Sequence, residues 1–256
     1  MSRPTVLLTN DDGIGARFLR ELAAACQEAG METWVAAPTG ERSWIGRAFS
    51  RNRIVPVADI AGVGDRAWAL DGTPSDCVNI ALGHLLPRRP DVVLSGMNIG
   101  YNASMPLCLS SGTLAGATEG AAWGLPAVAA SFDLDQATFE VVRHAKEDCP
   151  PALLDPLRSA CRHAARFAAG LVGQPQPGVL VHNLNFPSTT RDDTPWERTV
   201  PAHLRLGSLY ARDTHGFSFT WSEGEIVGRR TDTDVACIER GNISHTEVDF
   251  ARLGRD

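Results

Sequence analysis

The sequence predicts an α/β fold in which a doubly wound, mostly parallel sheet is flanked by helices. Short, continuous apolar runs recur along the first half of the chain, and such runs are typical of parallel strands covered on both faces. Segments with helical spacing of apolar residues alternate with these runs. The chain has 256 residues, of which 43% are hydrophobic, so it can bury the core of one large domain.

The first elements form a βαβ unit. We expect the first strand at residues 6–9, followed by apolar residues at helical spacing from Leu19 to Ala29. Gly30 is a suitable helix stop, and residues 33–37 form a second apolar run. The crossover between two such parallel strands is expected to be right-handed.

The alternation continues along the chain and then changes character. Further helices are expected at residues 77–86, 114–123 and 153–171, and further strands at residues 91–95, 127–131 and 179–182. From Trp196 onward the chain is rich in threonine, glycine and aromatic residues, with strand-like pieces at residues 205–211 and 217–221. This composition is typical of a protruding hairpin. We therefore expect residues 1–195 to form the α/β domain and residues 196–256 a C-terminal β-hairpin extension that packs on another subunit.

Composition and charge argue against several classes of function. The net charge of -6, without a concentrated basic face, argues against binding to a nucleic-acid duplex. No apolar run approaches the ~20 residues of a membrane helix, and Met1 to Pro4 lead directly into the first strand, so we expect neither a membrane partner nor a signal peptide. The six cysteines lack zinc-ligand spacing, which indicates buried thiols in a reducing compartment. A cytoplasmic enzyme is the expected class.

Two adjacent carboxylates follow the first strand. Asp11 and Asp12 stand between Asn10 and Gly13, at the carboxyl end of the strand, where open α/β sheets bind ligands. A pair of carboxylates at this end would attract a hard divalent cation such as Mg²⁺ or Mn²⁺. The same residue types are preferred in turns and helix N-caps, so the motif alone leaves a structural interpretation open.

Polar residues also follow the other predicted strands, and in a parallel sheet these loops gather at one edge. The residues concerned are Arg42, Ser43, Asn98, Asn102, Ser111, Gly112 and Thr113. A Ser-Gly-Thr sequence that opens a helix suits a phosphate, because the free N–H groups and the helix dipole favour an anion. Taken singly, each of these residues has an alternative role as a turn, cap or solvated residue. Phosphate beside a divalent cation is the arrangement that phosphoryl transfer requires.

Together these motifs resemble the family of SurE, the stationary-phase survival protein, which comprises metal-dependent 5′/3′-nucleotidases that act on nucleoside monophosphates. The matching segments are residues 9–13, 37–38, 42–43, 72–78, 90–102 and 111–113, with weaker matches at 183–187 and 233–234. Their order and spacing agree with the family almost completely as far as Ser131.

The resemblance implies a Rossmann-like domain with a C-terminal extension, and a homodimer or homotetramer in which that extension is often exchanged. It implies that the divalent metal, Mg²⁺ or Mn²⁺, is held by Asp11, Asp12, Ser43 and Asn98. It also implies that the phosphate is bound by Asn102, Ser111, Gly112 and Thr113. Asp11 and Asp12 are the candidate catalytic residues, since either could orient or deprotonate the attacking water.

Three segments depart from the family pattern. Trp44 follows Ser43 where the family usually has glycine, and residues 103–110 replace a segment that commonly holds a glycine, an acid and a tyrosine. Residues 244–247 differ from the family's Ser-x-Thr-Pro stretch. Because the first two changes adjoin the expected leaving group, two alternatives stay open. One is a phosphatase for another small phosphorylated metabolite of a specialised biosynthetic pathway, and the other is a non-catalytic, phosphate-ligand-binding paralogue.

Other mechanisms find less support. Covalent aspartyl-phosphate phosphatases of the haloacid-dehalogenase type use Asp-x-Asp, whereas here the acids are adjacent. A dinucleotide-dependent oxidoreductase would need G-x-G-x-x-G after the first strand, where this chain places two acids. The histidines lie outside the matched loops and are expected to be surface or capping residues: His84, His144, His163, His182, His203, His215 and His245.

Overall fold

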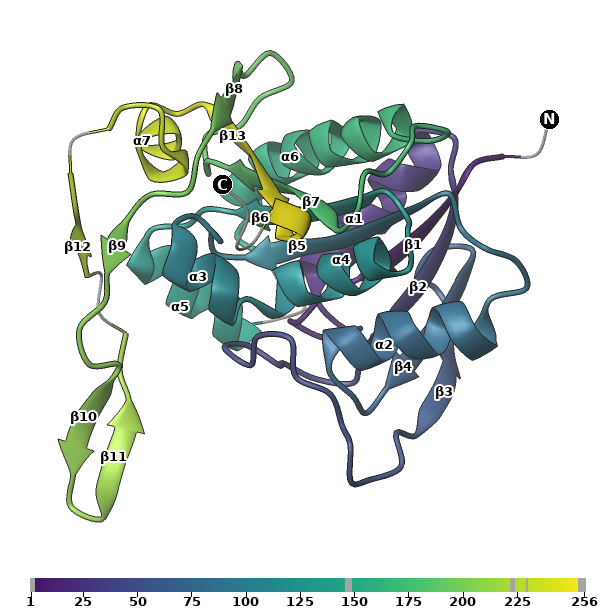
Figure 1. The fold of residues 1–256 in the computed structure, drawn as a ribbon, viewed down its shortest axis with the longest axis horizontal. Helices are drawn as coiled ribbons and strands as arrows, with labels where there is room; N and C mark the ends of the chain where they lie inside the picture. The colour runs from purple at the N-terminus through teal and green to yellow at the C-terminus, as the bar shows by residue number, and fades with distance from the viewer. Residues whose placement is uncertain (1–2, 146–148, 222–223, 229, 253–256) are drawn as a thin grey trace.

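The computed structural model describes the chain except residues 1–2, 146–148, 222–223, 229 and 253–256 (Figure 1). The start of the chain and parts of the segment 196–256 therefore lie outside the described residues. A nine-stranded sheet forms the centre, in the order β3-β4-β2-β1-β5-β6-β7-β13-β8. Its strands are β1 (Thr5–Thr9), β2 (Glu32–Pro38), β3 (Val57–Ile60), β4 (Arg66–Leu70), β5 (Val92–Ile99), β6 (Ala127–Phe132), β7 (Leu180–Phe186), β8 (Trp196–Thr199) and β13 (Ile243–Asp249).

The six strands from β4 to β7 in this order are parallel, which confirms the predicted fold class. The edge strand β3 runs antiparallel to β4, and β13 runs antiparallel to β7. The helices are α1 (Arg17–Glu28), α2 (Pro74–Ile80), α3 (Met105–Ser110), α4 (Gly112–Ala122), α5 (Gln136–Ala145), α6 (Pro151–Gly170) and α7 (Asp234–Glu239), with a π-helical turn, η1 (Ala81–Leu85), and a 3-10 turn, η2 (Phe250–Arg252).

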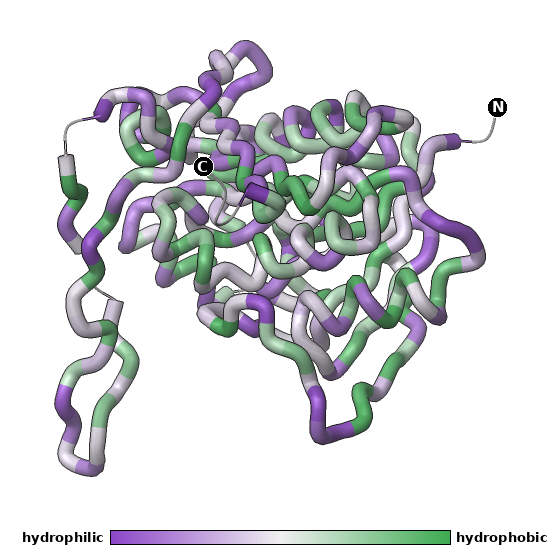
Figure 2. Tube along the Cα trace, viewed as in Figure 1, coloured by the Kyte–Doolittle hydropathy of each residue, from purple (hydrophilic) through white to green (hydrophobic). Residues whose placement is uncertain are grey.

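Helices cover both faces of the sheet, and successive residues of β1 point to opposite layers. Leu8 packs in a cluster with residues of α1 and α6, whereas Leu7 packs with Trp34 and Cys77. This double burial explains why the strand sequence is continuously apolar. In Figure 2 the strands at the centre of the molecule are accordingly drawn largely in green, the colour of hydrophobic residues.

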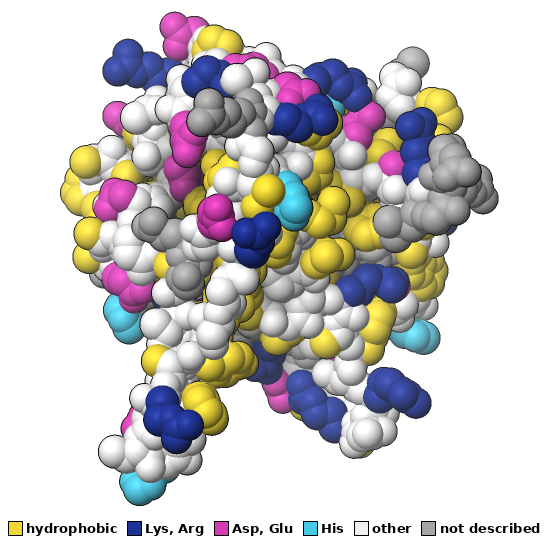
Figure 3. Space-filling model, turned by 60° about the vertical axis from the view of Figure 1, so that its left-hand side comes forward, with side chains coloured by type: hydrophobic (Ala, Val, Ile, Leu, Met, Phe, Trp, Pro, Cys, Tyr) yellow, Lys and Arg dark blue, Asp and Glu magenta, His cyan; other side chains and the backbone are white. Residues whose placement is uncertain are grey.

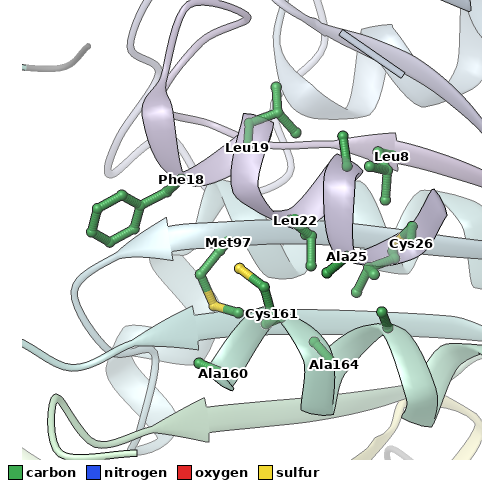
Figure 4. Close-up of a cluster of buried hydrophobic side chains, with 14 of the residues drawn as sticks. Leu8, Phe18, Leu19, Leu22, Ala25, Cys26, Met97, Ala160, Cys161 and Ala164 are labelled. Carbon is green, nitrogen blue, oxygen red and sulfur yellow. The ribbon is translucent and has the colours of Figure 1, made fainter. Parts of the chain in front are cut away.

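Helices α1 and α6 pack side by side on one face. Figure 4 shows Leu22 and Cys26 of α1 facing the small side chains of Ala160, Cys161 and Ala164 on α6. Small residues at this contact let the two helices approach closely. The centre of this contact is filled by apolar side chains, and at its edge Arg158 of α6 donates to Glu21 of α1 at 3.0 Å.

The sequence did not predict β3, β4, α3, α5, α7 or the position of β13. The segment 196–256 contributes β8 and β13 to the central sheet, and a long excursion separates them. Within that excursion, β9 (Leu204–Arg205) pairs with β12 (Glu225–Ile226), and β10 (Tyr210–Asp213) pairs with β11 (Gly216–Phe219) as a hairpin.

The hairpin is present as expected and protrudes from the body (Figure 1). Every residue of β10 and β11 is exposed, including the aromatic side chains of Tyr210, Phe217 and Phe219. Figure 3 shows this arm extending below the body, with hydrophobic side chains at the surface where it departs. None of the helices in the described part of the chain combines the length and the hydropathy of a membrane-spanning segment.

Candidate functional site

The polar loops lie where the strand order changes direction. After β1 the chain passes to β2 on one side, whereas β5 lies on the other side of β1. Crevices at the carboxyl ends of such strands are the usual ligand sites of open α/β sheets. Asp11 and Asp12 follow β1, and Asn98 is near the end of β5, so the switch point carries three of the four predicted metal residues.

Asn10 and Gly13 build the turn that presents the two acids. The Asn10 side chain donates to the Gly13 carbonyl at 3.0 Å and accepts from the Gly13 N–H at 3.2 Å. Gly13 has a φ of 106°, and a Cβ there would lie 3.1 Å from the Cα of Gly40. Asn10 and Gly13 therefore act as turn residues, as the structural interpretation of the motif predicts.

Asp11 is buried against the start of α4. The Thr113 hydroxyl donates to Asp11 Oδ1 at 2.7 Å. Helix α4 can approach because residue 112 is glycine: a Cβ there would lie 2.8 Å from Asp11 Oδ2 and 3.1 Å from the Arg42 carbonyl oxygen. Three residues predicted for the site, Asp11, Gly112 and Thr113, are therefore in direct contact.

Burial raises the pKa of Asp11 to about 6, although the hydrogen bond from Thr113 acts in the opposite direction. The negative charge of Glu41 raises this pKa further. A nearby cation would favour the ionised carboxylate. A bound cation would therefore stabilise the ionised form of the buried Asp11 side chain.

Asp12 and Asn98 connect the first loop to the end of β5. The N–H of Ile99 donates to Asp12 Oδ2 at 3.2 Å. Asn98 donates through its side-chain Nδ2 to the Gly100 carbonyl at 2.6 Å, which leaves its Oδ1 as a potential ligand. The register between β5 and β6 shifts between Ser95 and Asn98, and this irregularity sets how Asn98 is presented.

The second loop also approaches Asp11. The N–H of Arg42 donates to the Asp11 carbonyl oxygen at 2.7 Å, and the Ser43 hydroxyl donates to Glu41 at 3.0 Å. The Arg42 guanidinium pairs with Asp71 at 2.7 Å, so its charge is engaged there. Glu41 is an acid that the sequence interpretation missed, and its only signal was its place directly before Arg42 and Ser43.

The predicted phosphate residues divide into two groups. Ser111 caps α4, because its Oγ accepts from the Leu114 N–H at 3.0 Å, and Thr113 is bound to Asp11. Asn102 has other partners: its Nδ2 donates to Ser131 Oγ and its N–H donates to Asn185 Oδ1, both at 2.8 Å. The structure therefore brings Gly112 and Thr113 to the carboxylates and fixes Asn102 beside β6 and β7.

The assembled donors fit a hard divalent cation. The loop after β1 offers two carboxylates, the last residues of β5 offer the Asn98 amide oxygen, and the loop after β2 offers the Ser43 hydroxyl, which donates to Glu41. Such oxygen ligands suit Mg²⁺ and Mn²⁺. The burial of Asp11 beside the charge of Glu41 is the structural observation that supports this fit.

Aromatic rings lie beside the second loop. The Trp44 ring is 5.2 Å from that of Phe219 and 5.7 Å from that of Trp221, measured between centroids. Trp44 has a φ of 62°, a left-handed conformation that glycine would adopt more readily. Trp44, which stands where the family usually has glycine, therefore contacts aromatic side chains of the protruding arm.

Two histidines correct the expectation that all of them are surface or capping residues. His163 and His182 are buried, each 8% exposed. A ring nitrogen of His163 is 2.8 Å from the Arg191 carbonyl oxygen, and Trp196 Nε1 donates to its other ring nitrogen at 3.3 Å. Burial of this kind depends on tertiary contacts that the isolated sequence does not reveal.

Comparison with known proteins agrees with the fold and the motifs. The family model described as "Survival protein SurE" matches residues 6–205. The 5′-nucleotidase SurE of Desulfovibrio desulfuricans is 36% identical over 255 residues, covering 96% of this chain and 92% of the relative. The enzyme of the same name from Methanosarcina acetivorans is 32% identical, covering 98% and 94% respectively. The crystal structure of the SurE protein from Aquifex aeolicus matches with a TM-score of 0.73 at 23% identity, covering 96% of this chain and 93% of that one. The chain belongs to the SurE family.

Proposed function

We propose that this protein is a metal-dependent phosphomonoesterase that hydrolyses nucleoside 5′(3′)-monophosphates to nucleoside and phosphate. The observation that carries the proposal is the contact between Asp11 and the start of α4, where Thr113 donates to Asp11 at 2.7 Å. This contact puts an acidic centre next to a helix N-terminus that favours anions. The relatives named 5′-nucleotidase support the same reaction and substrate class.

In this proposal Asp11, Asp12, Ser43 and Asn98 hold Mg²⁺ or Mn²⁺. When bound, such a cation polarises the phosphoryl group and makes water a better nucleophile at neutral pH. The chain's own groups orient the reactants: Thr113 fixes one carboxylate, and the Ile99 N–H fixes the other. One of these two carboxylates also orients or deprotonates the attacking water.

The phosphate binds at the first turn of α4. Ser111, Gly112 and Thr113 supply N–H groups there, and Asn102 forms the wall on the side of β6. Donors that are fixed in advance stabilise the charge that develops on the phosphoryl oxygens without a cost of reorganisation. The absence of a side chain at Gly112 is required for this arrangement, since a Cβ would overlap Asp11.

The nucleoside is accommodated beside Trp44. This ring, with Phe219 and Trp221 of the arm, forms an aromatic surface adjacent to the second loop. Bases stack on aromatic side chains with little sequence preference, so the surface suits a nucleoside leaving group. A leaving group without a flat ring would gain less from it.

Assembly and location belong to the same proposal. The exposed aromatic residues of the arm support a homodimer or homotetramer in which the arm packs on a neighbouring copy. The six cysteines are unpaired, which supports a reducing compartment such as the cytoplasm. Light scattering of the intact chain, compared with a variant in which Phe217 and Phe219 are changed to serine, tests the assembly.

A panel of phosphomonoesters tests the reaction. Phosphate release should be fastest with nucleoside 5′- or 3′-monophosphates in the presence of Mg²⁺ or Mn²⁺. Rapid hydrolysis of another phosphorylated metabolite, with nucleotides inert, would replace the nucleotidase assignment by the alternative metabolite phosphatase. Binding of nucleotides without turnover of any phosphomonoester would identify a phosphate-ligand-binding paralogue.

A further inference from the structure

Two histidines and a glutamate meet on the antiparallel pair β7 and β13. The register places Glu247 directly opposite His182, and His245 opposite Leu184 on the same side of the sheet. His182 Nδ1 lies 3.0 Å from His245 Nε2 and 3.9 Å from Glu247 Oε1. One ligand atom from each of the three residues falls within 4.8 Å of the other two.

We propose that His182, His245 and Glu247 form a binding site for a transition-metal cation, with Zn²⁺ as the best match. Zinc bonds to imidazole nitrogen and carboxylate oxygen at about 2.0–2.2 Å in tetrahedral geometry, so its ligand atoms lie about 3.4 Å apart. The two separations from His182 Nδ1, 3.0 and 3.9 Å, bracket this value. Two imidazoles and one carboxylate leave the fourth position for water.

The site is separate from the loops that carry the proposed phosphatase centre. Along β7, His182 shares the face of Leu184 and Phe186, which pack in the cluster that contains α1 and α6. Asn183 points to the other face, where its side chain donates to the Asn102 carbonyl at 2.8 Å. The inference about the histidines therefore does not rest on the proposed function.

A rigid aromatic support holds both rings. Phe167 of α6 contacts His182 edge-on at 5.3 Å and His245 edge-on at 4.9 Å, measured between ring centroids. Trp196 of β8 stacks on Phe167 at 5.6 Å with an interplanar angle of 14°. Packing therefore restricts both rings before any ion arrives, which lowers the cost of assembling the ligands. The hydrogen bond between His182 Nδ1 and His245 Nε2 is replaced by the metal, and its proton moves to the other nitrogen of the ring or to solvent.

The cluster is open to solvent on one side. The Glu247 side chain is 37% exposed, so an ion can enter from solvent on that side.

One cation already competes for this cluster. Arg198 of β8 pairs with Glu247 Oε1 at 2.7 Å. The Arg198 side chain is 70% exposed, so it can release the carboxylate without disturbing the core. If Glu247 ligates the metal, removal of this guanidinium must strengthen metal binding, because Arg198 competes for the carboxylate and repels a cation.

The test is a titration with Zn²⁺ against a chromophoric chelator, together with the visible absorption of bound Co²⁺, which reports its coordination. Both are measured in Asp12→Asn protein, so that binding near β1 does not mask the signal. This Asp12→Asn protein, the parent of the variants below, should bind one equivalent of Zn²⁺ tightly. His245→Gln and Glu247→Gln should each weaken the affinity at least about tenfold, the lower limit for losing even a hydrogen-bond partner of a ligand. Arg198→Met should strengthen it.

His84→Ala is the matched control, because His84 is exposed and belongs to η1, away from the cluster in sequence and strand pairing. It should bind Zn²⁺ like the parent. Far-ultraviolet circular dichroism checks that each variant is folded, and Glu247→Gln changes an exposed side chain with little risk to folding. Equal affinities in the parent, His245→Gln and Glu247→Gln, or no binding in the parent, would overturn the proposal. An unchanged affinity in Arg198→Met would contradict ligation by Glu247.

Discussion

Two clusters of polar residues in the same sheet differ in donor chemistry and in the elements that present them. Asp11 and Asp12 offer oxygen atoms from the turn after β1, and Asn98 offers one from the carboxyl end of β5. His182 and His245 offer nitrogen atoms from within the strands β7 and β13. The first set suits a hard cation that takes part in phosphate chemistry, and the second suits a borderline transition metal.

Position in the fold determines how easily a site is recognised and how it can act. Loops at a topological switch point can surround a ligand, since several backbone N–H groups and side chains converge there. Strand residues are fixed by their register and present a rigid, nearly flat surface. A cluster on strands is therefore better suited to cross-linking β7 and β13 than to enclosing a substrate.

Asp12→Asn tests the oxygen cluster with the largest expected effect. The substitution keeps the size of the side chain but removes a charged ligand of the proposed cation. We expect kcat/KM for a nucleoside monophosphate to fall by at least about 10³-fold. The Asp12→Asn protein should still bind one tight equivalent of Zn²⁺ at His182 and His245, and loss of this binding together with activity would show that the clusters are not independent.

Gly112→Ala should have the next largest effect. The new Cβ would lie 2.7 Å from Asp11 Cβ, so either α4 or the first loop must move. A displacement of about 1 Å at a reacting centre costs on the order of 10²-fold in rate. Steady-state kinetics would measure the loss, and Gly30→Ala serves as a stability control because its φ of 82° is also strained for alanine, whereas a Cβ there meets no neighbour. Wild-type rates in Gly112→Ala would contradict the close packing of α4 on Asp11 during catalysis.

Thr113→Val removes one hydrogen bond while preserving the shape of the side chain. Asp11 Oδ1 would lose the hydroxyl that donates to it at 2.7 Å. A hydrogen bond to a charged group contributes about 1.5–3 kcal/mol, so we expect a loss of at least about tenfold in kcat/KM. Thr113→Ser should recover most of the activity; failure of serine to do so would assign the effect to packing.

Of the four substitutions, Trp44→Gly should have the smallest effect on activity, and this effect should fall mainly on KM. Loss of stacking against the base should raise KM for a nucleoside monophosphate about fivefold or more, with kcat nearly constant. For a phosphomonoester without an aromatic ring, KM should hardly change. Glycine also accepts the left-handed φ of 62°, so thermal unfolding should not reveal a loss of stability. A similar rise in KM for both substrates would exclude stacking as the cause.

The first half of the fold was predictable because its signals are local. The apolar run of β1, the helical spacing from Leu19 to Ala29 and the glycine at position 30 agree with β1 and α1 as observed. The polar loops could be associated with one another because a parallel sheet places the carboxyl ends of its strands at one edge.

The remaining features depend on contacts that are remote in sequence. Strand β13 is partly polar and reaches the sheet only after the arm, so its pairing with β7 gave no periodic signal. Glu41 approaches Asp11 from another loop, and His182 meets His245 across 63 positions of the sequence. A single sequence does not reveal which of many charged or imidazole side chains converge in this way.

The centre around Asp11 and Asp12 is proposed to be a cation-dependent phosphatase centre. The most direct measurement is phosphate release from a nucleoside monophosphate by the intact protein, before and after removal of metal with a chelator and after readdition of Mg²⁺ or Mn²⁺. Chelation should abolish release, and either cation should restore it in the wild type but not in folded Asp12→Asn protein. Release that persists in chelator and is unchanged in Asp12→Asn would show that this centre does not depend on a cation.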